Sequence, residues 1–229
     1  MGALLRRLLS PLYHMITFYI VHNCILKKHI FVIKINKENG ILKKDIIRQD
    51  YAKKRQELSS LQFQEASSKL IQNTIELIKK YNLKCIHCFL PIESKDEINT
   101  ALFIQYCWEN NIKVVVPVSN FDDGTLKTAE FKPHTKTKLT KHNIPEPIDP
   151  VWTKSDAIDL VITPLLAFDL KGYRVGYGKG FYDRFFASLP KDTKKVGISL
   201  FEPCEVIEDV NEHDIPLTHC VTPNKIFTF

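Results

Sequence analysis

Apolar residues recur at helical spacing in two stretches that follow an irregular beginning. Residues 42–58 are basic with apolar positions on one side, and residues 60–81 carry an apolar stripe with the 3.6-residue period of a helix. Ser59 and Ser60 offer hydroxyl groups that can accept hydrogen bonds from the first amides of the second stretch. The pattern therefore predicts two consecutive helices.

Short continuous apolar runs, typical of buried strands, follow these helices. The runs are residues 85–90, 113–118, 160–168, 195–200 and 220–222, with a strand-like piece at 126–131 and an extended segment at 143–147. Helices are expected at 101–108, with Thr100 as its N-cap, and at 181–189. A strand, a helix and a strand in this order form a parallel crossover unit. We therefore expect one three-layer α/β domain: an open, mostly parallel, Rossmann-like sheet with helices on both faces and ligands beyond the carboxyl ends of its strands.

The first forty residues differ from the rest, so we expect an extension at 1–40 and a folded domain at 41–229. The apolar stretch 12–26 is shorter than the roughly 20 residues that a membrane span needs. Arg6 and Arg7 before an apolar run resemble the start of a signal peptide, but no small-residue cleavage site follows. The absence of any acid before Glu38 would also suit an organellar transit peptide. The alternative is a reading frame extended upstream of a start near Leu42. We expect a cytoplasmic protein, or an organellar one if the extension is a transit peptide.

The net charge of +6 comes mainly from this beginning. Residues 1–40 hold six Lys or Arg and one Glu, a charge of +5, which leaves +1 for the remainder. A domain that docks on a phosphate backbone carries a clustered basic excess. The charge therefore does not indicate a nucleic-acid partner, and we expect none, nor a membrane.

Of six cysteines, Cys85 and Cys88 form a C-x-x-C pair. The pair lies within a predicted strand, where residues three apart point to opposite faces. No second C-x-x-C completes a zinc site. We expect buried structural thiols and a reducing compartment.

A glycine-rich segment follows the run at 160–168. Gly176, Gly178 and Gly180 alternate with Tyr177 and Lys179 directly before a predicted helix. Such glycines can turn successive amides toward one anion, and the helix N-terminus adds further amides.

Charged side chains surround these glycines. Arg174 and Lys179 can bind phosphate, and Asp183 offers a hard oxygen for Mg²⁺. The spacing matches neither the Walker pattern nor the dinucleotide fingerprint. A phosphate site is the favoured interpretation, and a flexible surface turn is the alternative.

Together these segments resemble the signature of the 5-formyltetrahydrofolate cyclo-ligase family, also called methenyltetrahydrofolate synthetase. The resemblance runs from about residue 42 to 229. Its matching segments are Lys44–Arg48 with Arg55, Phe89–Glu97, Ile144–Pro147, Pro164–Asp169, Gly172–Asp183 and Asn211–Asp214. Tyr177 stands where some members carry Arg.

The resemblance implies cyclisation of 5-formyltetrahydrofolate to 5,10-methenyltetrahydrofolate, with ATP and Mg²⁺ as cofactors and release of ADP and phosphate. The formyl oxygen would be phosphorylated first, and the neighbouring folate nitrogen would then displace phosphate. Such phosphoryl transfer needs mainly positioning and charge neutralisation. We expect a monomer or a weak homodimer.

The resemblance also implies roles for individual residues. Lys179 and Arg174 would be the catalytic cations. ATP would contact Lys44, Arg48, Arg174, Gly176, Gly178, Lys179, Gly180, Phe181 and Tyr182. Folate would contact Leu90, Glu97, Tyr177 and Phe181, and the metal would be held by Asp183 and Asp214. An insertion near 93–97 leaves Glu93 as the alternative to Glu97, although the spacing to Ile98 favours Glu97.

Two other functions remain open from the residues. A sugar-phosphate or CoA-handling protein on a related sheet would also use a glycine-rich anion site. A folate-binding protein without catalysis would bind 5-formyltetrahydrofolate but not turn it over.

Overall fold

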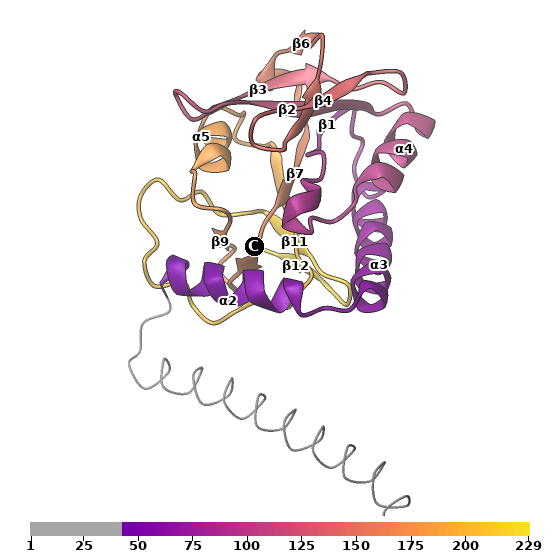
Figure 1. Ribbon diagram of the computed structural model, residues 1–229. Coiled ribbons are helices and arrows are strands. Elements are labelled where there is room, and N and C mark those ends of the chain that lie inside the picture. Colours follow the sequence, from indigo (N-terminus) through magenta and orange to yellow (C-terminus); the bar gives the residue numbers. More distant parts are fainter. Residues whose placement is uncertain (1–42) are drawn as a thin grey trace, which may run out of the picture. The chain divides into compact units, whose positions relative to one another are not determined.

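A computed structural model describes residues 43–229, and helices form in it where apolar residues recur at helical spacing (Figure 1). The helices are α2 (Lys44–Gln56), α3 (Ser60–Ile78), α4 (Ala101–Glu109) and α5 (Phe181–Ala187), with 3₁₀ turns η1 (Glu93–Lys95) and η2 (Ser155–Ala157). The expected cap of α3 is confirmed: Ser59 Oγ accepts from the Gln62 amide at 3.3 Å. In return, Gln62 Oε1 accepts from the Ser59 amide at 3.0 Å, which completes a capping box.

Thr100 occupies the N-cap position of α4, as expected, but its side chain makes no capping hydrogen bond. Its hydroxyl donates instead to the Phe89 carbonyl at 2.9 Å, and the Ala101 amide is bonded by Asn99 Oδ1 at 2.9 Å. The Thr100 side chain is buried, so its hydroxyl satisfies an interior carbonyl rather than the helix end.

The strands form an eight-stranded mixed sheet and two small hairpins. In chain order they are β1 (Cys85–His87), β2 (Lys113–Asn120), β3 (Thr125–Glu130), β4 (Thr137–Leu139), β5 (Pro145–Pro147), β6 (Trp152–Thr153), β7 (Leu160–Pro164), β8 (Ala167–Phe168), β9 (Arg174–Val175), β10 (Lys194–Ile198), β11 (His219–Val221) and β12 (Ile226–Thr228). The large sheet has the order β12-β11-β10-β7-β1-β2-β3-β6. Its centre, from β11 to β2, is parallel, and antiparallel strands close both edges.

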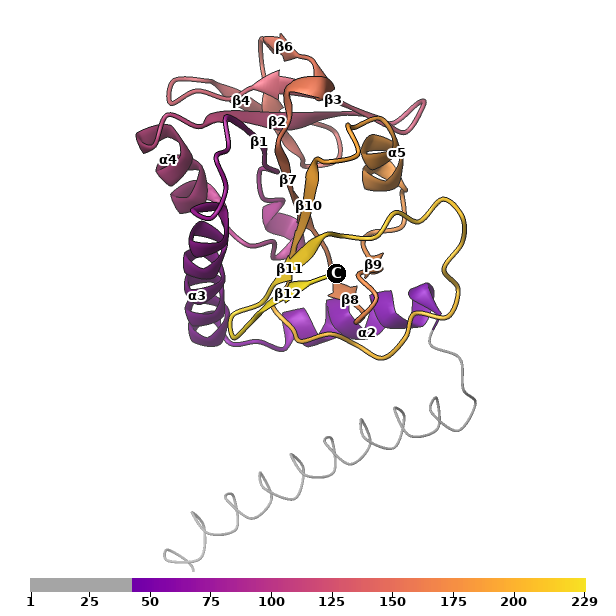
Figure 2. The same cartoon turned by 180° about the vertical axis from the view of Figure 1, so that it is seen from behind.

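Helices cover both faces of this sheet, which confirms the three-layer α/β prediction (Figure 2). The strands distribute their apolar side chains between two cores: Val114 and Val116 lie in the core beneath α3 and α4, whereas Val115 lies in the core with α5. Both faces of the parallel centre are buried, which explains the continuous apolar runs.

The two cysteines of the C-x-x-C pair also separate between these cores. Cys85 lies in the α5 core and Cys88 in the opposite one, and both are free thiols. Burial raises the pKa of the Cys85 thiol to about 11. The prediction of buried structural thiols is confirmed for this pair.

The predicted single strand at 160–168 is divided in two. β7 ends at Pro164, which has no amide to continue the ladder. The chain then turns away, and the Leu166 amide donates to the Val175 carbonyl at 2.8 Å. β8 and β9 form an antiparallel hairpin, so the glycine-rich segment follows this hairpin and not the long strand.

The strand predicted at 220–222 is β11, one residue earlier, and it is not the last. β12 follows it antiparallel along the sheet edge. β3, predicted as a strand-like piece, pairs antiparallel with β2, and the extended segment at 143–147 contains β5, which pairs with β4. No helix among residues 43–229 combines the length and hydropathy needed to cross a membrane. The predictions for the extension at 1–40 lie outside the described residues.

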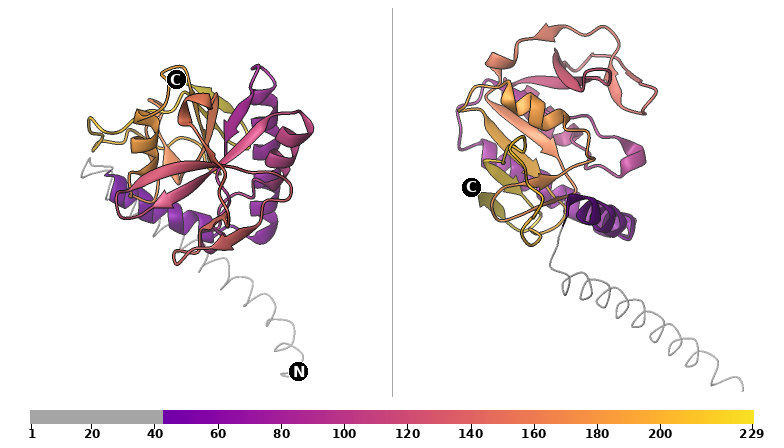
Figure 3. Two further views of the ribbon diagram at one scale, coloured as in Figure 1. Left: turned by 90° about the horizontal axis from the view of Figure 1, so that it is seen from above. Right: turned by 90° about the vertical axis from the view of Figure 1, so that its left-hand side faces the viewer.

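This arrangement places several loops at one end of the sheet. α2 contacts β8 and β9, the hairpin that follows the carboxyl end of β7. The views in Figure 1 and Figure 3 show α2 lying across this end of the twisted sheet. The loops after β1, β2 and β9 therefore face a space bounded by α2.

Asp159 fixes the start of the central strand pair and gives a test of the fold. Its Oδ2 atom accepts from the amides of Lys84 at 2.7 Å and Cys85 at 2.8 Å. Asp159→Ala should lower the free energy of unfolding by about 1–3 kcal/mol because both amides lose a charged acceptor.

Urea denaturation measures this change, with Asp156→Ala as the control, since Asp156 is an exposed acid in η2. We expect no loss for the control. Equal midpoints for the two variants would contradict the anchoring role.

Candidate functional site

A cavity of ≈ 970 Å³ lies at the carboxyl ends of the parallel strands. Its wall combines α2, the loops after β1 and β2, and the glycine-rich segment. All the residues to which the sequence assigned ligand contacts lie on this wall: Lys44, Arg48, Leu90, Glu97, Arg174, Gly176, Tyr177, Gly178, Lys179, Gly180, Phe181, Tyr182, Asp183 and Asp214. Residues from four distant parts of the chain thus share one space, while their individual roles stay predictions.

The glycine-rich segment needs glycine at two of its three alternating positions. Gly178 (φ 83°) and Gly180 (φ 68°) have left-handed backbones, in which other residues are strained. Gly176 does not, and a methyl group placed there would meet no atom within 4 Å. The sequence expectation that all three serve the backbone turn is therefore too broad.

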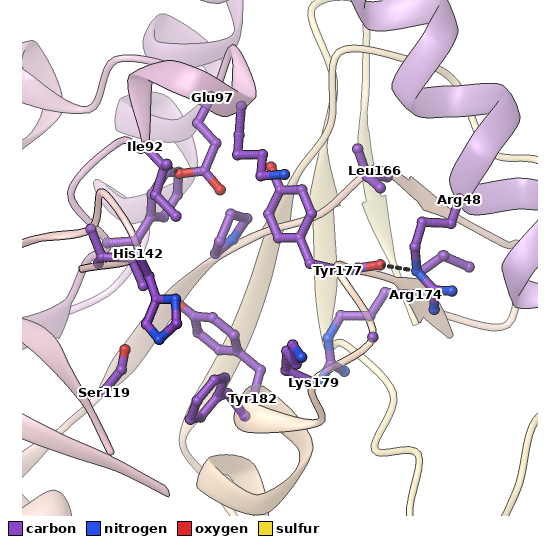
Figure 4. A pocket seen from close by; sticks show the side chains of 18 of the residues that line it. Arg48, Ile92, Glu97, Ser119, His142, Leu166, Arg174, Tyr177, Lys179 and Tyr182 are labelled. Atoms are coloured by element: carbon purple, nitrogen blue, oxygen red, sulfur yellow. Dashed lines mark hydrogen bonds between the residues drawn. The ribbon is translucent and has the colours of Figure 1, made fainter. Parts of the chain in front are cut away.

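Arg48 connects this segment to α2. Its Nε donates to the Gly176 carbonyl at 2.9 Å (Figure 4). A Cβ at Gly178 would lie 3.1 Å from the Arg48 guanidinium carbon. The cation and the glycine loop are consequently packed together.

Two ion pairs line the same end of the cavity. Arg174 donates to Asp183 Oδ1 at 2.7 Å, and Lys44 Nζ donates to Asp214 Oδ2. Arg174 is held further by the Ile215 carbonyl, and only 7% of its side chain is exposed. Burial lowers the pKa of the Arg174 guanidinium, and the Asp183 carboxylate acts in the opposite direction. The paired carboxylates keep these cations in place within a partly buried site.

Asp183 and Asp214 each keep one oxygen available. Asp183 Oδ1 also accepts from the Ile215 amide at 3.2 Å, and Asp214 Oδ2 from the Asn211 amide at 2.7 Å. Within residues 43–229, no hydrogen bond reaches Asp183 Oδ2 or Asp214 Oδ1. No group of three or more His, Cys, Asp or Glu in this part of the chain is arranged to hold a metal by itself. One or two carboxylates together with phosphate oxygens are a usual set for Mg²⁺, and these two residues fit that set.

The opposite end of the cavity contains a buried carboxylate. Glu97 is 7% exposed, and its Oε2 accepts from the Ile92 amide at 2.8 Å. Burial raises the pKa of Glu97, while the hydrogen bond from the Ile92 amide and the neighbouring Arg55 and Lys95 cations lower it. Figure 4 shows Glu97 and Tyr177 projecting into the same space. Glu93 is exposed and does not line the cavity, so the geometry favours Glu97 between the two.

Comparison of the sequence with known proteins identifies a family that it matches. The model of the 5-formyltetrahydrofolate cyclo-ligase family matches residues 41–223. The chain belongs to this family. A 5-formyltetrahydrofolate cyclo-ligase of Haemophilus influenzae is 32% identical over 181 residues, which cover 76% of this chain and 95% of that protein. One of Escherichia coli K12 is 35% identical over 138 residues, covering 57% and 74%.

Solved structures of similar name share the fold. A 5,10-methenyltetrahydrofolate synthetase from Mycoplasma pneumoniae has a TM-score of 0.63 at 22% identity, covering 79% of this chain and 98% of that one. The synthetase of Aquifex aeolicus has a TM-score of 0.66 at 24% identity, covering 81% and 92%. The resemblance drawn from the signature is confirmed, and the cyclo-ligase family makes this chain a ligase.

An aromatic part of the cyclo-ligase cavity was not found from the sequence. Phe121 stacks on His142 with ring centroids 3.9 Å apart and meets Phe181 edge-on at 5.1 Å. Phe121 follows β2, and His142 lies between β4 and β5. Nothing local in either loop signals this contact, because it depends on how the β4–β5 hairpin folds back.

Arg55 was also missed as a cavity residue, although a signal was present. Lys44, Arg48, Ala52 and Arg55 follow one another at spacings of four, four and three along α2, and all line the cavity. Such spacings put residues on one helix face. Extending the basic face of the predicted helix by one more turn would have included Arg55 among the predicted site residues.

The glycine loop gives a test of this geometry. Gly178→Ala should cost about 1–2 kcal/mol of unfolding free energy because of its left-handed backbone, and it should displace Arg48 as well. Gly176→Ala is the matched control, with neither strain nor a close neighbour. Urea denaturation of the two variants should therefore differ, and equal stability would show that the loop is not held as described.

Proposed function

We propose that this chain uses MgATP to cyclise 5-formyltetrahydrofolate to 5,10-methenyltetrahydrofolate, releasing ADP and phosphate. The observation that carries the proposal is a single cavity with two chemically different ends. One end has glycines and cations suited to phosphates, and the other has a buried carboxylate and aromatic rings suited to a pterin. The names of the relatives support the same substrate class.

The phosphate end supplies positive charge from three elements. Lys44 and Arg48 come from α2, and Arg174 from β9. Lys179 is exposed, and its ammonium group has no hydrogen-bond or ion-pair partner among residues 43–229, so it can bind a triphosphate without breaking a contact. Clustered cations of this kind stabilise the charge that spreads over a transferred phosphoryl group.

The folate end supplies recognition. The Glu97 carboxylate can accept hydrogen bonds from the amino group and ring N–H of a pterin, which are adjacent donors. Leu90, Tyr177 and Phe181 provide apolar and aromatic walls for the rings. Proximity of the two ends would bring the formyl oxygen to the γ-phosphorus.

The reaction then proceeds in two substitutions. The formyl oxygen attacks the γ-phosphorus, the bond to the bridging oxygen of ADP breaks, and ADP leaves. The neighbouring N10 atom attacks the activated formyl carbon, the carbon–oxygen bond breaks, and phosphate leaves with the proton of N10. Phosphorylation is needed because an amide oxygen is a poor leaving group.

Mg²⁺ would be held by Asp183 and Asp214 together with phosphate oxygens, and it would neutralise charge on the nucleotide. The two unused oxygens described above are the observation behind this assignment. When phosphates and the ion bind, Arg174 and Lys44 can exchange part of their pairing with these carboxylates for pairing with phosphate.

The first test is ATP-dependent formation of the methenyl chromophore from 5-formyltetrahydrofolate. Lys179→Ala should lower kcat by roughly a hundredfold or more while leaving folate affinity, measured by calorimetry, nearly unchanged. Lys171→Ala is the control, since Lys171 is exposed and lies outside the cavity wall.

The outcomes separate the alternatives. Tight folate binding without turnover would support a binding protein, and absence of both would support a sugar-phosphate or CoA-handling function. Equal loss of kcat and folate affinity in Lys179→Ala would contradict the assignment of this lysine to ATP.

The metal is tested by removing it. Chelation should abolish turnover, and added Mg²⁺ should restore it. Asp214→Asn should raise the Mg²⁺ concentration for half-maximal rate by about tenfold or more, since even an outer partner of a metal has effects of that size. Glu212→Gln, an exposed acid of the same loop, is the control. An unchanged Mg²⁺ requirement in Asp214→Asn would remove Asp214 from the metal site.

A further inference from the structure

Arg55 is a buried cation that forms no ion pair with an acidic group among residues 43–229. It is 5% exposed, at the last turn of α2. Its Nη2 donates to the Leu165 carbonyl at 2.7 Å, and its Nη1 lies 3.4 Å from both the Lys95 carbonyl and the Tyr177 hydroxyl. All these acceptors are uncharged, and Nε has no partner among residues 43–229. Burying a charge in this way is costly, which calls for a reason.

Glu97 is an acidic group on which the Arg55 cation acts, and it shares the cavity with Tyr177. The Tyr177 hydroxyl accepts a long hydrogen bond from Arg55 Nη1, at 3.4 Å, and Figure 4 shows the Tyr177 and Glu97 side chains projecting into the same space. The charged and titratable groups that act on Glu97 are Arg55, Lys95, Tyr177 and Tyr182, from α2, η1, the glycine-rich segment and α5. Arg55 thus acts on the Glu97 carboxylate without forming an ion pair with it among residues 43–229.

Lys95 is held by the same guanidinium through its backbone. The Lys95 carbonyl belongs to η1, the turn that leads into Glu97. Arg55 therefore contacts the backbone of the turn that leads into Glu97 and, separately, the hydroxyl of Tyr177. A guanidinium can serve these separate acceptors at once because its donors are spread in one plane, whereas an ammonium is a compact point charge.

We propose that Arg55 is a positioning residue that orients the Glu97 carboxylate, through Tyr177 and the η1 backbone, to accept the pterin of the folate substrate. This inference rests on the proposed function for the identity of the ligand. In this role Arg55 does not contact the reacting atoms of ATP or folate. We therefore expect its replacement to change folate binding and to leave phosphoryl transfer unaffected.

The positive charge of Arg55 determines the direction in which the pKa of Glu97 should change when Arg55 is replaced. Burial raises the pKa of Glu97, and Arg55 and Lys95 lower it. Removing the Arg55 cation therefore raises the pKa of Glu97 further. Since the ionised carboxylate accepts the pterin hydrogen bonds, folate affinity is lost as the pH falls through this pKa, and in the variant it is lost at higher pH.

The experiment is the pH profile of kcat/KM for 5-formyltetrahydrofolate at saturating MgATP, in the full chain. In Arg55→Met the acid limb should move up by about one pH unit. At alkaline pH, kcat and the KM for ATP should match the wild type. Arg55→Lys should restore part of the shift, Tyr177→Phe should give an intermediate one, and Glu97→Gln should lose this limb. Lys54→Met, a neighbour on α2 that pairs with Asp50 outside the cavity, should behave as wild type.

Several outcomes would overturn the inference. An acid limb in Arg55→Met that coincides with the wild-type limb would do so, as would equal losses in folate KM, ATP KM and kcat at every pH. If Arg55→Met does not fold, as judged by its Tm, Arg55→Lys and Tyr177→Phe carry the same test. If the wild type binds 5-formyltetrahydrofolate but forms no methenyl product, the proposed reaction fails, and calorimetric folate affinity against pH still tests Arg55.

Discussion

The packing of α2 against the glycine-rich segment is the contact on which the candidate site depends. Arg48 Nε donates to the Gly176 carbonyl across 128 residues of chain, and Gly178 leaves just enough room for the guanidinium. This contact places Lys44 and Arg48 at the same end of the cavity as Arg174. It also brings Arg55 to the end that contains Glu97. A helix that is separate from the sheet in sequence thereby completes a site at the carboxyl ends of its strands, where open α/β sheets bind ligands.

Charge in the cavity is arranged so that neither end requires a ligand to remain stable. At the phosphate end, Arg174 and Lys44 are paired with Asp183 and Asp214. In the proposed reaction, a phosphate group and a metal ion would together bring the same two kinds of charge, so binding would exchange partners without leaving a buried ion alone. At the other end the Arg55 cation lowers the pKa of Glu97 without an ion pair among residues 43–229, and it donates to the Tyr177 hydroxyl.

The two ends also explain why neither rival function accounts for the whole cavity. A protein that handles only phosphates has no use for the buried Glu97 with its aromatic surroundings. A protein that only stores folate has no use for Lys179 beside left-handed glycines, since its ammonium group has no partner among residues 43–229. Membership in the cyclo-ligase family is consistent with the proposal that the cavity takes both kinds of ligand.

From the sequence alone we could predict the main helices and strands, the mostly parallel sheet, the separation of Cys85 from Cys88 and the segments that line the cavity. These features follow from local periodicity, from turn chemistry and from a long signature. The tertiary structure alone decided the break at Pro164, the edge strand β12, the contact of Phe121 with His142 and the burial of Arg55. Each of these depends on which distant segments pack together, and local spacing contains no record of that choice.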